Sequence, residues 1–137
     1  MKIIICGSMS AHKEMSDVKV TLEQSGHIVE MPNLNNLGHG LDSNGNTLET
    51  SQIKIEQDLI RGYFHKINNS DSVLAVNVNK NGMGGYIGGN TFLELGFGYA
   101  LNKKLYILNP YSREISYYDE IDAMQPIVLN GDLGKIE

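Results

Sequence analysis

The chain has 137 residues, of which 41% are hydrophobic and 20% are charged, with a net charge of −5 and one cysteine. This length and composition predict one domain over residues 1–137 that buries a core without disulfides or metals. The acidic balance lacks the lysine and arginine footprint that nucleic-acid backbones require, so we expect no nucleic-acid partner. No segment reaches the roughly 18 apolar residues of a membrane span. The apolar run at the start is too short for a signal peptide, so we expect a cytoplasmic protein without a membrane partner.

Apolar runs of strand type alternate along the chain with segments of helical periodicity. Strands are expected at 3–6, 27–31, 73–78, 105–108 and 127–129, and helices at 12–24, 53–67, 92–101 and 116–124. The first run is β-branched and ends at Gly7 and Ser8, as in a buried strand. Residues 33–51 are polar and aperiodic, which indicates a long loop that is either a lid or partly disordered.

This alternation predicts a three-layer, doubly wound α/β domain of Rossmann or flavodoxin type. Its five parallel strands would have the order 2-1-3-4-5, because crossovers between parallel strands are right-handed. Such sheets bind ligands at the carboxyl ends of their strands, near the switch between strands one and three. The loops at 7–11, at 77–90 and after Asn109 would meet there.

A glycine-dense loop leads into the third expected helix, and an isolated acid follows it near the start of that helix. Four of the fifteen glycines fall within 84–89, and Glu94 is the only acid between Asp71 and Glu114. One interpretation is a capping box, in which Thr91 caps the helix and Glu94 bonds back to its amide. The other is a nucleophile, since a carboxylate in the first helical turn is stabilised as an anion and can attack an anomeric carbon. The motif by itself does not separate the two.

The wider pattern resembles the nucleoside 2-deoxyribosyltransferase family and its relatives, the 2′-deoxynucleoside 5′-monophosphate N-glycosidases. The resemblance runs over most of the chain and rests on five stretches: Gly7-Ser8, 70–76, 88–91, 94–100 and 103–108. The most specific stretch is Glu94-Leu95-Gly96 through Ala100, ahead of a lysine-led strand. The resemblance implies that Glu94 is the catalytic nucleophile.

The resemblance also implies a set of substrate-binding residues around this glutamate. Gly7, Ser8 and Met9 match the turn that helps to hold a 5′-phosphate, and a Gly-Ser turn entering a helix is an anion nest. The alternative for this turn is an ordinary strand-to-helix connection. The loop before the glutamate would line the substrate through Gly88, Gly89, Asn90 and Thr91.

Two asparagines follow the third expected strand, where the family often has an acid. Asn77 and Asn79 are expected to contact substrate, but an amide cannot transfer a proton at neutral pH. This departure either weakens the case for transferase chemistry or moves the acid to another residue. Tyr117 and Tyr118 would either complete a neighbouring subunit's pocket or pack the last helix. Cys6 is expected to be an inert, buried thiol.

We therefore expect an enzyme that cleaves or exchanges the N-glycosidic bond of 2′-deoxynucleosides or their 5′-monophosphates. It would use a covalent glutamyl-deoxyribosyl intermediate, a small-molecule nucleoside or nucleotide partner, no metal and no cofactor, and it would form a homo-oligomer. Hydrolysis and base transfer both stay open. One alternative is a non-catalytic nucleotide-binding or sensing module on the same fold. Another is a phosphoribohydrolase, since the Gly-Gly-x-Thr-x-x-Glu outline also resembles the cytokinin-activating phosphoribohydrolases. A third is a flavin-binding domain, which would be yellow.

Overall fold

Parallel β-strands form the centre of the computed structural model, which describes residues 1–32, 55 and 58–137. The strands are β1 (Lys2–Cys6), β2 (Ile28–Glu30), β3 (Ser72–Ala75), β4 (Lys104–Ile107) and β5 (Ile127–Val128). They form one five-stranded sheet in the order β2-β1-β3-β4-β5, and every neighbouring pair is parallel. The predicted fold class and strand order are confirmed. The expected loop at 33–51 and most of 53–57 lie outside the described residues.

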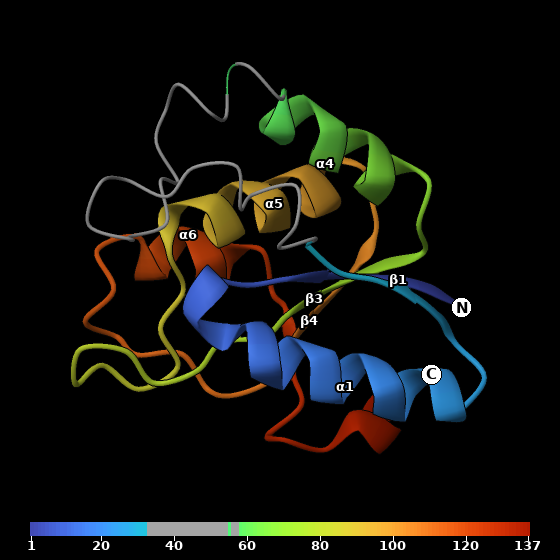
Figure 1. Cartoon of the computed structure of the whole chain (residues 1–137). Helices are drawn as coiled ribbons and strands as arrows, with labels where there is room; N and C mark the ends of the chain where they lie inside the picture. Colours follow the sequence, from blue (N-terminus) through green and yellow to red (C-terminus); the bar gives the residue numbers. More distant parts are fainter. Residues whose placement is uncertain (33–54, 56–57) are drawn as a thin grey trace, which may run out of the picture.

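Helices cover both faces of the sheet and complete three layers (Figure 1). They are η1 (Met9–Ala11), α1 (His12–Gln24), α4 (Leu59–Asn68), α5 (Gly89–Ala100), α6 (Tyr118–Ala123) and η2 (Leu133–Lys135). Figure 1 shows α1 with the C-terminal η2 on one face, and α4, α5 and α6 on the other. In the described ranges, no helix is long and apolar enough to cross a lipid bilayer.

The predicted end of the first helix is confirmed in detail. Gly26 adopts φ +94°, a left-handed conformation that suits glycine after a helix. Its amide donates to the carbonyl of Glu23 (3.0 Å), and the amide of His27 donates to that of Leu22 (3.1 Å). These bonds satisfy the last helical carbonyls and turn the chain into β2.

Side chains of β1 alternate between two hydrophobic cores, as the pleat of a strand requires. Ile3 and Ile5 belong to the core beneath α1, whereas Ile4 and Cys6 belong to the core beneath α4 and α5. All four side chains are fully buried. The alternation therefore places the thiol of Cys6 on the face of the sheet that α5 covers.

Candidate active site

Two turns leave the sheet side by side at the carboxyl ends of β1 and β3. Cys6 pairs with Ala75 in the sheet register, and the amide of Val76 donates to the carbonyl of Cys6 at 2.8 Å. Residues 7–9 follow β1, and the loop that begins at Asn77 follows β3. The predicted switch point of the sheet is therefore where these two predicted binding segments meet.

Asn77 holds this edge of the sheet together with its side-chain amide. Its Nδ2 donates to the carbonyls of Asn109 (2.7 Å) and Gly85 (3.2 Å), and its Oδ1 accepts from the amide of Asn109 (2.9 Å). Asn109 returns a bond from its own Nδ2 to the carbonyl of Asn77 (2.8 Å). Asn77 is only 2% exposed, so its amide braces the loops after β3 and β4.

Asn79 and Gly85 fix the course of the glycine-dense loop. The Oδ1 of Asn79 accepts from the amide of Gly85 at 3.1 Å. Gly85 has φ +61°, and a Cβ there would lie 1.9 Å from the carbonyl oxygen of Pro110. Only glycine fits this position without displacing the loop. The predicted substrate contacts of Asn77 and Asn79 stay predictions, whereas their bracing role is visible in the structure.

The helix that carries Glu94 begins earlier than the sequence predicted. The N-cap of α5 is Gly88, and the amide of Phe92 already donates to the carbonyl of Gly88 at 2.9 Å. Thr91 is thus inside the helix and makes no N-cap, so the capping-box interpretation is wrong. The expectation that Glu94 sits in the first turn is wrong as well, because it is the sixth residue of α5. The helix dipole acts mainly within the first turn, so it contributes less to this carboxylate than the sequence suggested.

The half-buried Glu94 lies close enough to Cys6 and Tyr63 for its charge to act on both side chains. Burial raises the pKa of the Cys6 thiol well above its usual value, and the charge of Glu94 raises it further. The thiol therefore stays protonated at neutral pH. The predicted burial of Cys6 is confirmed, but sequence analysis missed its closeness to Glu94.

Tyr63 of α4 is the other ionisable group on which Cys6 and Glu94 act. Its hydroxyl donates to the carbonyl of Ile5, next to Cys6 in β1. Burial raises the pKa of Tyr63 well above its usual value, and the charges of Cys6 and Glu94 raise it further. Cys6 and Tyr63 therefore both stay neutral at neutral pH.

The turn after β1 packs tightly and carries polar groups. A Cβ on Gly7 would lie 2.9 Å from the Sδ of Met15 and 3.0 Å from the carbonyl oxygen of Val76. The hydroxyls of Ser8 and Ser10 are 2.8 Å apart, and η1 separates this turn from α1. Gly7, Ser8 and Met9 are all partly exposed. They are available to a ligand at this edge, and the predicted anion nest stays a prediction.

The start of α5 combines open backbone with a packed aromatic pair. Gly89 is exposed, and a Cβ there would have no atom within 4 Å, whereas Thr91 is only 4% exposed. Phe92 stacks on Tyr117 with ring centroids 4.5 Å apart and an interplanar angle of 15°. The hydroxyl of Tyr117 donates to the carbonyl of Ile87. Tyr117 thus packs the segment before α6 against α5, which is one of the two roles left open by the sequence.

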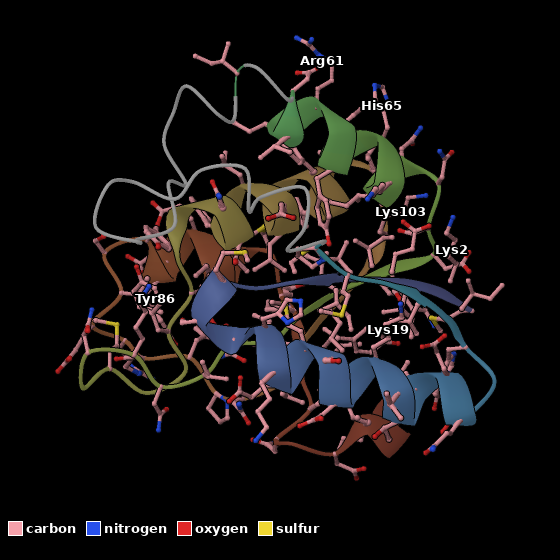
Figure 2. The ribbon with its side chains drawn as sticks, viewed as in Figure 1. Lys2, Lys19, Arg61, His65, Tyr86 and Lys103 are labelled. Carbon is pink, nitrogen blue, oxygen red and sulfur yellow. The ribbon has the colours of Figure 1, made fainter. Side chains whose placement is uncertain are left out.

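The amino ends of β1 and β4 lie on the side of the molecule opposite the glycine-dense loop. Figure 2 shows Tyr86 at the edge where the glycine-dense loop lies, and Lys2 and Lys103 at the opposite edge. Asp71 also lies at that opposite edge, where it accepts from the amide of Lys2 at 2.7 Å. In the described part of the chain, no three His, Cys, Asp or Glu side chains lie close enough to hold a metal ion.

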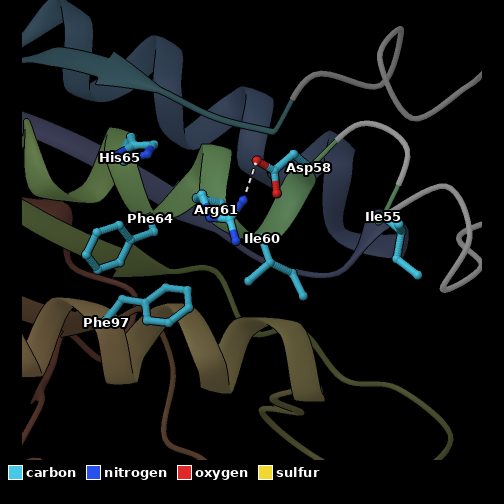
Figure 3. A pocket seen from close by; sticks show the side chains of 7 residues that line it. All are labelled: Ile55, Asp58, Ile60, Arg61, Phe64, His65 and Phe97. Atoms are coloured by element: carbon cyan, nitrogen blue, oxygen red, sulfur yellow. Dashed lines mark hydrogen bonds and ion pairs between the residues drawn. The ribbon is translucent and has the colours of Figure 1, made fainter.

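A cavity of about 1100 Å³ lies against α4 and α5 (Figure 3). It is lined by Ile55, Asp58, Ile60, Arg61, Phe64, His65 and Phe97. The rings of Phe64 and Phe97 meet edge to face at 5.3 Å, and Arg61 pairs with Asp58 at 3.2 Å. None of the predicted site residues is among the described residues that line this cavity.

Comparison with known proteins finds a similar fold among solved structures. No family model matches the sequence, and no curated protein matches it. Among solved structures, the chain is similar to the CMP N-glycosidase BcmB of Clostridium botulinum, with a TM-score of 0.56 and 13% sequence identity. The match covers 95% of this chain and 90% of that chain. At this identity the likeness is one of fold.

Proposed function

We propose that this protein is an enzyme that cleaves or transfers the N-glycosidic bond of 2′-deoxynucleosides or their 5′-monophosphates. The observation that carries the proposal is the place of Glu94. It lies in the second turn of α5, the helix that follows the glycine-dense loop, close enough to Cys6 at the end of β1 for its charge to act on the thiol. A carboxylate on the helix that follows a ligand-binding loop can act as the nucleophile on a bound sugar.

In the proposed reaction, a carboxylate oxygen of Glu94 attacks C1′ of the sugar. The bond from C1′ to the base nitrogen breaks, and the base leaves with the bonding electrons and takes a proton from an acid or from water. Water, or a second base, then attacks C1′ and releases the carboxylate of Glu94. These steps use neither a metal nor a cofactor. Gly7, Ser8 and Met9 would hold the 5′-phosphate, and Gly88, Gly89, Asn90 and Thr91 would line the sugar.

The fold comparison supports a nucleotide substrate for this site. BcmB is described as a CMP N-glycosidase, and its fold spans nearly the whole of this chain. CMP contains ribose, so the sugar must be tested rather than assumed. The substrate panel should therefore contain ribonucleotides beside deoxyribonucleotides, which also tests the phosphoribohydrolase alternative.

The test is base release, measured by chromatography, from nucleosides and 5′-monophosphates of both sugars, with and without an acceptor base. We expect Glu94→Gln to release base at least about 10³-fold more slowly than the wild type, while it still binds the nucleotide. The matched control is Glu23→Gln, which removes the same charge from an exposed position on α1 and should leave activity unchanged. A new nucleoside formed in the presence of acceptor base identifies a transferase.

A second candidate function is a non-catalytic module that binds or senses nucleotides. The observation that favours it is the pair Asn77 and Asn79, whose amides occupy the end of β3 where proton transfer would need an acid. Nucleotide binding without base release in either the wild type or Glu94→Gln would support this candidate and contradict the enzyme.

A further inference from the structure

The loop between β3 and α5 contains a short hairpin to which the proposed reaction gives no role. The backbone of Lys80 exchanges two hydrogen bonds with that of Met83, at 3.0 and 2.9 Å, and the amide of Tyr86 donates to the carbonyl of Val78 at 3.0 Å. The two residues at the tip, Asn81-Gly82, have φ of +53° and +78°. Positive φ at both positions is typical of a type I′ turn, whose twist matches that of a hairpin. This part of the loop is therefore an ordered element with its own hydrogen bonds.

Two side chains of the hairpin, Lys80 and Tyr86, contact each other beside the start of α5. The ammonium nitrogen of Lys80 lies 5.4 Å from the centre of the Tyr86 ring. The same ring packs on Gly88, the N-cap of α5, where a Cβ would lie 3.4 Å from Cε1 and 3.6 Å from the hydroxyl oxygen of Tyr86. The hairpin thus holds a cation over a ring that lies against a residue predicted to line the sugar.

Lys80 is the only charged residue in the segments that are predicted to bind substrate. Residues 7–9 and 77–91 contain no other lysine or arginine and no acid, and Glu94 follows them. Among the described residues, no carboxylate forms an ion pair with the Lys80 ammonium. A phosphate monoester carries about 1.5 to 2 negative charges at neutral pH, and the turn at 7–9 offers it only neutral amides and a hydroxyl. A phosphorylated substrate would need a cation near Glu94, and Lys80 is the one that this loop supplies.

We propose that Lys80 binds the 5′-phosphate of the substrate and that the ring of Tyr86 positions its ammonium group. This inference rests on the proposed function and narrows the substrate class to nucleoside 5′-monophosphates. Lysine binds phosphate as a point charge on a flexible stem, and contact with an aromatic face restricts where that stem places the charge. Nucleosides lack the group that this cation binds, so they should bind more weakly.

The experiment measures affinity by isothermal titration calorimetry in Glu94→Gln, which is expected to bind without turnover. The probes are dAMP, dGMP, dCMP, dTMP and CMP, each compared with its nucleoside. A monophosphate that binds should do so at least about tenfold more tightly than its nucleoside. Addition of Lys80→Met should weaken its binding about 10- to 100-fold, as expected for a lost hydrogen bond to a charged group, and change nucleoside affinity by less than about twofold.

Two further variants separate the charge of Lys80 from its place on the hairpin. Lys80→Arg keeps the charge and should retain most of the preference for monophosphates. Tyr86→Leu removes the ring and should weaken monophosphate binding about two- to fivefold, the size typical of an exposed cation–π contact.

The matched control is Lys66→Met, which removes the same charge from the same kind of contact. The ammonium nitrogen of Lys66 lies 5.7 Å from the centre of the Tyr63 ring. Lys66 is exposed in the last turn of α4, which leads into the start of β3 rather than its carboxyl end. This variant should leave the affinities for monophosphate and nucleoside unchanged.

The outcomes separate this inference from the proposed function. No loss in Lys80→Met, or an equal loss for monophosphate and nucleoside, would overturn the role of Lys80. Monophosphate binding that depends on Lys80 in a protein whose wild type releases no base would support the phosphate site and contradict the enzyme. Base release from nucleosides and monophosphates at equal rates, unchanged in Lys80→Met, would do the reverse. No binding of any probe would contradict both.

Discussion

Asn77 and Asn79 are the same residue type two positions apart, yet their side-chain amides form different hydrogen bonds. The amide of Asn77 donates to two carbonyls and accepts from one amide, all of them in loop backbone. The amide of Asn79, on an exposed residue, accepts from the amide of Gly85 through its oxygen. A carboxylate could replace the second amide but not the first, because it cannot donate when ionised.

Asn77→Asp should therefore lower the stability of the fold strongly, and Asn79→Asp should change it little. For Asn77→Asp we expect the free energy of unfolding to fall by about 2–4 kcal/mol, because two carbonyls lose their donor and face a buried negative charge. For Asn79→Asp we expect a change of less than about 1 kcal/mol. Urea unfolding at neutral pH measures both. Equal losses in the two variants would contradict the bracing role of the Asn77 amide.

Sequence analysis could assign Asn77 and Asn79 to the carboxyl edge of the sheet, since they follow an apolar strand. It could not assign their partners. Asn109 follows β4 and meets Asn77 only when β3 and β4 lie side by side, whereas Gly85 meets it when the loop after β3 turns back. A residue in a predicted site can thus be a brace for the loops that form the site.

Among the elements, α5 makes close contacts with the sheet through a glycine. A Cβ on Gly98 would lie 2.8 Å from side-chain carbons of both Leu105 and Val73, which belong to β4 and β3. A Cβ on Gly96, two residues earlier, would have no atom within 4 Å. The same helix therefore has one glycine that packing requires and one that it does not.

Substitution of these two glycines by alanine should have opposite effects on stability. We expect Gly98→Ala to lower the free energy of unfolding by about 1–3 kcal/mol, because the added methyl overpacks the contact with a stiff β-branched side chain. We expect Gly96→Ala to raise it by up to about 1 kcal/mol, because alanine has the higher helix propensity. Urea unfolding of the pair tests this, and a Gly98→Ala protein as stable as Gly96→Ala would contradict the packing of α5.

The start of α5 is one element boundary that sequence analysis placed wrongly; the third strand, expected at 73–78, is Ser72–Ala75, and the last helix, expected at 116–124, is Tyr118–Ala123. Thr91 and Glu94 have the spacing of a capping box, which led to a start at residue 92. The helix begins at Gly89 instead, with glycine as its N-cap and no side-chain cap. Local spacing offered a plausible cap, but packing of the whole helix against β3 and β4 set its start.

For the whole molecule, self-association stays a prediction. It derives from the resemblance to the nucleoside 2-deoxyribosyltransferase family, in which a second subunit often completes a half-open site. We expect sedimentation equilibrium at micromolar concentration to give a mass of at least twice the 15.2 kDa of one chain. A single species at the mass of one chain would contradict the expectation and would require the proposed site to be complete within one subunit.

The sequence by itself determined the order of elements, the five parallel strands in their order, and the edge of the sheet where the glycine-dense loop lies. These features follow from local hydrophobic periodicity and from the right-handedness of parallel crossovers, which any chain with this pattern obeys. Only the tertiary structure decided that Tyr63 bonds to Ile5 and that Asn77 bonds to Asn109. Each pair joins residues far apart in the chain, and their side chains come within hydrogen-bonding range only after the helices pack on the sheet.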